Sequence, residues 1–246
     1  MESAAVETTR GPLGLKGHLA GIIDVLGAHY GARPWQSRGR PVDVLIETVL
    51  SQNTSDVNSH RAFRALLDRF GSLEGVAAAD VTDIEETIRL AGLSRVKSVR
   101  IKQILERLRA EHGSLNLEFL LNMDVSAARH YLTSLPGVGP KTASCVLVFS
   151  LGVPVFPVDT HVYRVSKRLG LISRNTSLEQ AEAELEAMIE PTDRYRTHLH
   201  LIEHGRLVCR ARKPSCHQCV LAEICPSAFT FDGSEATAYS PRREAQ

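Results

Sequence analysis

The chain has 246 residues, of which 43% are hydrophobic and 23% charged, and its formal net charge is +1. This composition is typical of a globular protein with a real core, and no stretch approaches the ~18–20 uninterrupted apolar residues of a membrane span. Because the first residues, MESAAVETTR, lack a basic start followed by an apolar run, we expect no secretory signal and a cytoplasmic location.

Apolar residues recur at helical spacing along most of the chain, and sustained period-2 alternation is missing, which predicts an all-α fold. One such segment runs from Val42 to Leu50, and another follows Ser177, where Gln180 completes a capping-box pattern. The apolar run 153–158 contains two prolines, so we expect a loop there rather than a strand. The polar or small ends, 1–14 and 229–246, are expected to be mobile.

Basic residues gather in two stretches of this nearly neutral chain. Residues 95–109 hold six basic residues against one acid, and residues 194–213 hold six against one. Such local patches suit a surface that follows phosphate groups. Charge alone is equally compatible with two solvated helix faces.

The segment 135–142 reads LPGVGPKT and lies between two helical patterns. Two glycines two positions apart permit a tight turn, and the N–H groups that open the second helix can bind a phosphate. The same pattern also fits an ordinary helix–helix turn. Asp159 follows Lys141 by 18 residues at the start of a further amphipathic helix, where it is either an N-cap, a functional carboxylate, or both.

Four of the five cysteines cluster near the C-terminus with the spacing Cys209-x6-Cys216-x2-Cys219-x5-Cys225. In a chain without a secretion signal, this clustering predicts a metal site rather than disulfides. The spacing alone leaves zinc and an iron–sulfur cluster open. We expect Cys145 to be a buried, inert thiol and His217 to be exposed.

The sequence LPGVGPKTA followed by PVDTHVYRVSKRLGL resembles the helix-hairpin-helix DNA glycosylase/AP lyase superfamily, and endonuclease III in particular. The likeness extends to residues 50–56, to Ala91-Gly92-Leu93 with Lys97, to residues 203–206 and to the cysteine cluster. It implies a two-lobed helical fold with a [4Fe–4S] cluster held by Cys209, Cys216, Cys219 and Cys225. The cluster is expected to be chiefly structural.

The function implied by this resemblance is a bifunctional enzyme of base excision repair. It would remove oxidised or damaged pyrimidines from duplex DNA and cleave the abasic site by β-elimination through a Schiff base on Lys141. Asp159 would stabilise the developing sugar cation and shuttle protons. A helix N-terminus and partial desolvation would favour the neutral amine that attacks, and the target nucleotide must be flipped out of the stack.

The resemblance also implies residues that bind DNA. Asn53 occupies the position that fills the space left by the flipped base, with the adjacent Gln52 as the alternative. The hairpin would bind phosphate through Gly137, Val138 and Gly139. The loop between the first two cysteines contributes Arg210, Arg212 and Lys213. We expect the partner to be duplex DNA with damaged bases or abasic sites, and the protein to be a nucleoid-associated monomer without a membrane partner.

The expected domains are one lobe made of residues 1–42 and 154–228, a second lobe of residues 43–153 that ends in the hairpin, and a tail of residues 229–246. Lys141 and Asp159 would face each other across the cleft between the lobes. Two alternatives stay open, a mismatch-type thymine or uracil glycosylase and a non-catalytic DNA-binding module. Thr133 and Pro140 depart from the family pattern, which leaves the preferred lesion and opposite base open.

Overall fold

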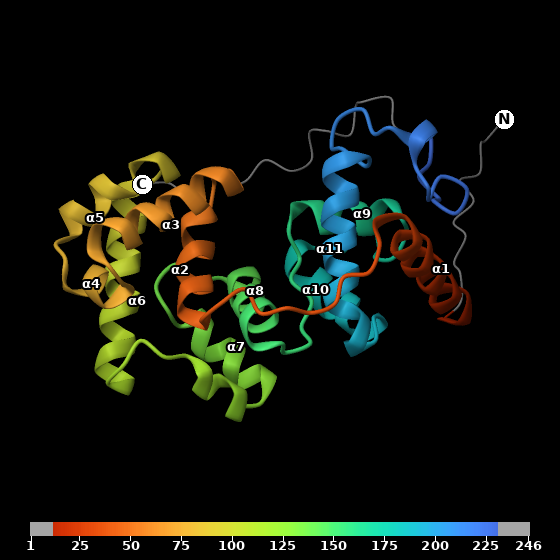
Figure 1. Ribbon diagram of the computed structural model, residues 1–246. Coiled ribbons are helices and arrows are strands. Elements are labelled where there is room, and N and C mark those ends of the chain that lie inside the picture. Colours follow the sequence, from red (N-terminus) through yellow and green to blue (C-terminus); the bar gives the residue numbers. More distant parts are fainter. Residues whose placement is uncertain (1–11, 231–246) are drawn as a thin grey trace. The chain divides into compact units, whose positions relative to one another are not determined.

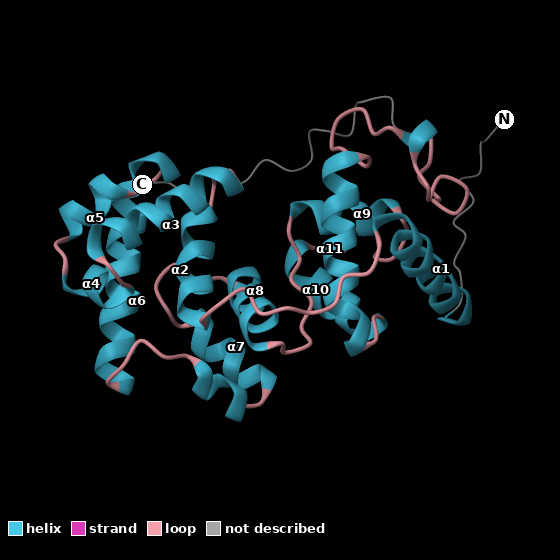
Figure 2. Cartoon of the chain, viewed as in Figure 1, coloured by secondary structure: helices cyan, strands magenta, loops and turns pink. Residues whose placement is uncertain are grey.

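The computed structural model describes residues 12–230, and all regular secondary structure in this range is helical (Figure 1, Figure 2). The predicted all-α fold class is therefore confirmed. In chain order the α-helices are α1 (Pro12–Tyr30), α2 (Pro41–Ser51), α3 (Asp56–Phe70), α4 (Leu73–Ala78), α5 (Val81–Thr87), α6 (Ser94–His112), α7 (Val125–Thr133), α8 (Pro140–Leu151), α9 (Thr160–Arg168), α10 (Leu178–Met188) and α11 (Pro191–Leu207), with short 3₁₀ turns η1 (Arg89–Ala91), η2 (Glu118–Asn122) and η3 (Cys216–Gln218).

The chain divides into two compact units. One is the contiguous segment Trp35–Pro157, and the other combines the described residues up to Pro34 with those from Val158 onward. The contiguous unit begins before the expected residue 43 because the segment ahead of α2 is tied to the end of α8. The indole Nε1 of Trp35 donates to the carbonyl of Val148 (2.7 Å), and the backbone N–H of Arg38 donates to the carbonyl of Phe149 (2.9 Å).

Helix α2 forms the centre of the contiguous unit, where it packs against α3 and α8. Its predicted apolar positions are buried, among them Leu45, Ile46 and Leu50. Pro41 stands at the first helical turn of α2, where its missing N–H costs nothing and its fixed φ suits the helix. This packing holds in place the turn that follows α2 and the turn that precedes α8. Both turns carry predicted functional residues.

In the other unit, α11 packs against α9 and α1. Gly205 permits the close approach of α11 to α9, since a Cβ there would lie 3.0 Å from the Cβ of His161 and 3.2 Å from Cγ2 of Val165. Helix α10 opens with the predicted capping box, in which the Ser177 and Gln180 side chains bond to each other's backbone N–H groups.

Other expectations are met in part. The run 153–158 is a loop, as its prolines predict, and Cys145 is buried. Residues 12–14, expected to be mobile, instead form the start of α1, which has a proline at its first position. Residues 1–11 and 231–246 of the expected mobile ends lie outside the described residues. Among the helices of the described range, none has the length and apolarity that crossing a membrane requires.

Candidate catalytic residues and metal centre

Helices α7 and α8 form the predicted hairpin, with residues 134–139 as the turn (green in Figure 1). Gly137 has a φ of +73°, and a Cβ there would lie 2.4 Å from Cδ of Arg100, so both the turn and the close approach of Arg100 favour glycine. Val138 is only 5% exposed, and its N–H donates to the carbonyl of Leu135 (3.1 Å). Val138 therefore holds the turn together, while Gly137 and Gly139 are exposed.

Helix α8 begins without a side-chain cap. Gly139 is the N-cap residue, Pro140 occupies the first turn, and this turn contains no acidic residue. Its N–H groups are thus not satisfied by a capping side chain, which suits an incoming phosphate. The departure at Pro140 has a physical reason, because proline is preorganised for the start of a helix. The side chain of Lys141 is exposed in this turn, so the partial desolvation expected for it is not found.

The turn after α2 contains the two residues expected to fill the space of a flipped base. Asn53 is exposed and adopts a φ of +54°. The Gln52 side chain instead donates from Nε2 to the carbonyl of Gly137 (2.9 Å). The two neighbours therefore differ, since Gln52 links this turn to the hairpin and Asn53 projects its side chain to solvent.

The burial of Lys97 could not be predicted from the sequence. Lys97 belongs to the basic stretch 95–109, but it is 1% exposed and donates from Nζ to the carbonyls of Leu50 (2.7 Å) and Ala91 (2.8 Å). Burial lowers the pKa of Lys97 to about 8. Lys102 is also turned inward, to the carbonyls of Ala77 and Ala79. The stretch 95–109 is therefore partly internal support rather than one continuous basic surface.

Asp159 is the N-cap of α9, and its Oδ1 accepts a hydrogen bond from the backbone N–H of Val162 (2.7 Å). The cap fixes the position of this half-buried carboxylate at the positive end of the helix dipole. His161 next to it contacts Arg164 through Nδ1 (3.1 Å). Burial lowers the pKa of His161, with Asp159 acting in the opposite direction. His161 is therefore suited to a supporting role.

Two arginines of α9 hold the loop that carries the predicted phosphate contacts. Arg164 donates from Nε to the carbonyl of Cys209 (3.1 Å). Arg168 is buried and donates to the carbonyls of Arg210 (2.7 Å) and Ala211 (3.1 Å). With the backbone held from inside, the side chains of Arg210, Arg212 and Lys213 remain exposed.

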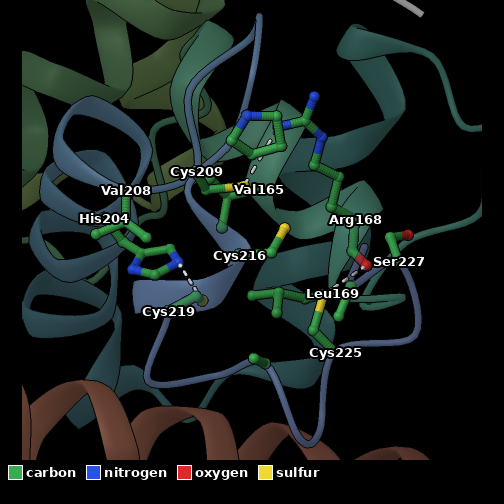
Figure 3. A pocket seen from close by; sticks show the side chains of 13 residues that line it. Val165, Arg168, Leu169, His204, Val208, Cys209, Cys216, Cys219, Cys225 and Ser227 are labelled. Carbon is green, nitrogen blue, oxygen red and sulfur yellow. Dashed lines mark hydrogen bonds between the residues drawn. The ribbon is translucent and has the colours of Figure 1, made fainter. Parts of the chain in front are cut away.

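The four clustered cysteines line one pocket (Figure 3). They come from the end of α11, from η3 and from the turns after it, and all are free thiols. The rest of the lining is mainly apolar, and it includes Val165, Leu169 and Val208. His217 is exposed, as expected for a site that four cysteines complete.

Nitrogen atoms of two side chains face two of the sulfurs. Arg168 donates from a guanidinium nitrogen to Sγ of Cys209 (3.4 Å), and Nε2 of His204 lies 3.5 Å from Sγ of Cys219 (Figure 3). Burial raises the pKa of Cys225 to about 11 and raises that of Cys219, whereas iron binding deprotonates a thiol outright. Four thiols around one mainly apolar pocket, with an arginine N–H donor to one of the sulfurs, fit an iron–sulfur cluster.

Comparison with known families places these features in context. A model of the HhH-GPD superfamily of base excision DNA repair proteins matches residues 46–191, and the iron–sulfur binding domain of endonuclease III matches residues 209–225. Endonuclease III from Synechocystis is 36% identical over 189 residues, which cover 76% of this chain and 82% of that protein. A relative from Arabidopsis thaliana is 38% identical over 172 residues, and there the chain spans only 59% of the relative's length.

Solved structures give the same result. A non-covalent endonuclease III–DNA complex and a trapped endonuclease III–DNA covalent intermediate each show 30% identity and a TM-score of 0.74, covering 87% of this chain and 97% of theirs. The chain belongs to the HhH-GPD superfamily of base excision DNA repair proteins. Within it, the protein is an endonuclease III-like DNA glycosylase, and its cofactor is the [4Fe–4S] cluster of that family.

Proposed function

We propose that the protein is a bifunctional DNA glycosylase/AP lyase that removes oxidised or damaged pyrimidines from duplex DNA. The observation that carries this proposal is the exposed Lys141 in the first turn of α8, directly after the hairpin turn. An amine at that position can reach a sugar whose flanking phosphate the hairpin binds. The trapped covalent complex of endonuclease III with DNA supports a covalent route in a relative.

In the proposed reaction, the damaged nucleotide is flipped out of the duplex, and Asn53 fills the space that it leaves. Positive charge builds on the sugar as the N-glycosidic bond breaks. The carboxylate of Asp159, which its cap hydrogen bond to Val162 keeps in place, stabilises that charge. The base leaves with a proton, and Nζ of Lys141 bonds to C1′ and loses its own proton.

Opening of the sugar ring then gives a Schiff base between Lys141 and C1′. Removal of a proton from C2′ expels the 3′ phosphate by β-elimination, and water later hydrolyses the imine to release the lysine. Asp159 is the carboxylate available to move these protons. The cluster acts structurally in this scheme, since it pins the loop of residues 209–216.

DNA binding in this proposal uses three sets of groups. The uncapped N–H groups of α8, with Gly137 and Gly139, take one phosphate. Arg210, Arg212 and Lys213 contact further phosphates. Asn53 inserts at the flipped base. The protein acts as a monomer on duplex DNA that holds a damaged base or an abasic site.

Borohydride trapping on duplex DNA with an abasic site tests the proposal. The wild-type protein should form a covalent adduct and cleave the strand. Lys141→Gln should do neither, while its DNA affinity stays nearly unchanged because the hairpin backbone still binds phosphate. Trapping that survives in Lys141→Gln would remove this lysine from the mechanism, and no trapping by the wild type would favour a non-catalytic DNA-binding module.

A panel of duplexes then distinguishes the enzyme classes. Excision of oxidised pyrimidines opposite normal partners supports the proposed substrate class. Excision restricted to thymine or uracil opposite guanine would assign the protein to the mismatch-type glycosylases instead. Thr133 is exposed, and its hydroxyl donates to the carbonyl of Arg129 (2.8 Å), so this departure from the family offers no carboxylate to a lesion.

A further inference from the structure

A chain of hydrogen bonds leads from α1 to the cysteine pocket. His204 on α11 is 1% exposed and lines that pocket. Its Nδ1 lies 3.0 Å from the hydroxyl of Tyr30, and its Nε2 lies 3.5 Å from Sγ of Cys219 (Figure 3). The proposed reaction uses neither Tyr30 nor His204.

The chemistry of the three groups fixes the direction of these hydrogen bonds. A neutral imidazole has one N–H donor and one acceptor nitrogen. A cysteine that ligates iron is a thiolate, which only accepts. The N–H must therefore be on Nε2, where it faces the sulfur, and the O–H of Tyr30 must donate to Nδ1. With the opposite tautomer, a nitrogen lone pair would face the sulfur's negative charge.

We propose that Tyr30 and His204 are positioning residues of the iron–sulfur cluster, in which the hydrogen bond from Tyr30 holds the His204 ring in the orientation that donates an N–H to the sulfur of Cys219. Such outer partners orient metal ligands and adjust the properties of the metal. A hydrogen bond to a ligand sulfur stabilises the more negative, reduced form of a cluster, so it raises the reduction potential. Arg168 makes the corresponding contact with Cys209, and the two donors thus act on two different ligands.

Substitutions at His204 separate its two hydrogen bonds. In His204→Gln the side-chain amide reaches about as far as Nε2, so it retains a donor to Cys219 and loses the acceptor for Tyr30. In His204→Asn the shorter amide reaches about as far as Nδ1, so it retains the link to Tyr30 and loses the donor to the sulfur. Tyr30→Phe keeps the imidazole but removes the hydroxyl that orients the ring.

Two matched controls come from the same unit. Tyr163→Phe removes a tyrosine hydroxyl that donates to the carbonyl of Thr176 (2.6 Å) and does not line the cysteine pocket. His200→Gln changes a buried histidine one turn earlier on α11, whose Nε2 lies 3.0 Å from the carbonyl of Gly31. Both controls change a side chain of the same type as the test residues, outside the cysteine pocket.

The measurements are the reduction potential of the cluster by spectroelectrochemical titration and its Fe–S(Cys) stretching bands by resonance Raman, on proteins with matched iron content. We expect His204→Asn and Tyr30→Phe to lower the potential, to shift these bands upward, and to lose the visible cluster absorption several-fold faster under chelator. His204→Gln and both controls should stay close to wild type.

Equal shifts in His204→Gln and His204→Asn would overturn the proposal, because the donor would then not be the property that matters. A Tyr30→Phe protein that is unchanged, or changed no more than Tyr163→Phe, would overturn it as well. If His204→Asn fails to load iron, the comparison of Tyr30→Phe with Tyr163→Phe still decides.

Discussion

At the scale of single residues, Asp159 has a capping role and a proposed catalytic role, and one substitution can separate them. It caps α9 through Val162, and we propose that it stabilises the sugar cation. Asparagine is also a good N-cap, so Asp159→Asn should keep the fold. Single-turnover base excision should nevertheless fall by a factor on the order of 10²–10³. Lyase activity on preformed abasic sites should suffer less, because the glycosidic bond is already broken. Equal losses of both activities together with a lower Tm would mean that Asp159 is only a cap.

Lys97 predicts an unusual pH dependence. Its pKa is about 8 in the folded protein against an ordinary value of 10.5, because burial disfavours the ammonium. Below pH 8 Lys97 is protonated in both the folded and the unfolded chain, and its buried charge destabilises the folded state. Between about pH 8 and 10.5 the unfolded chain binds more protons, so the stability that Lys97 contributes rises with pH. The unfolding free energy of the wild type minus that of Lys97→Met, measured by urea denaturation, should be larger at pH 9.5 than at pH 7.5. A difference independent of pH would contradict this.

At the scale of elements, the hairpin turn provides a matched pair of glycines. Gly137 has a positive φ and packs against Arg100, whereas Gly139 has a φ of −93° and open space at its Cβ position. Gly137→Ala should therefore destabilise the protein by at least about 1 kcal/mol and weaken DNA binding. Gly139→Ala should leave the stability nearly unchanged. Thermal unfolding of the two variants measures the contrast, and a similar Tm for both would show that the turn does not need its left-handed residue.

The loop between the first two cysteines, Cys209 and Cys216, is a second element that carries predicted DNA contacts. Arg164 and Arg168 hold its backbone, while Arg212 and Lys213 are exposed. Arg212→Ala and Lys213→Ala should weaken binding to all duplexes about equally and reduce the salt slope of binding by about one each. Lys16→Ala, an exposed lysine on α1, is the control. A changed lesion preference with an unchanged salt slope would mean that these residues contact bases rather than phosphates.

At the scale of the whole molecule, the cluster should stabilise only one of the two units. Its four cysteines all belong to the unit that contains α9 and α11, while the unit Trp35–Pro157 contains none of them. A cofactor that binds only the folded form stabilises it by mass action. Iron chelation should therefore expose residues 209–230 to protease first, and a fragment close to Trp35–Pro157 should persist. Simultaneous loss of both units, or a purified protein with stoichiometric zinc and no iron, would contradict this.

The sequence predicts what local patterns encode. The helical class, the hairpin, the capping box at Ser177 and the cysteine site each depend on residues close together in the chain, and each is present. The roles of Lys97, Gln52 and His204 depend on partners 47, 85 and 15 residues away. In the sequence, a buried lysine that donates to two backbone carbonyls cannot be distinguished from an exposed lysine that contacts phosphate. Only the packing of α6 against α2 separates these two cases.

The division of the chain has a consequence for its synthesis. The segment Trp35–Pro157 is contiguous, so it can fold as soon as it has left the ribosome. Helix α1 emerges earlier but packs against α11, which is translated only after this segment. Its apolar residues Ile22 and Leu26, which are buried in the folded protein, therefore stay exposed while Trp35–Pro157 is being translated. Helix α1 thus stays uncovered for longer during synthesis than the helices of Trp35–Pro157, and iron can complete the cysteine site only after translation has passed Cys225.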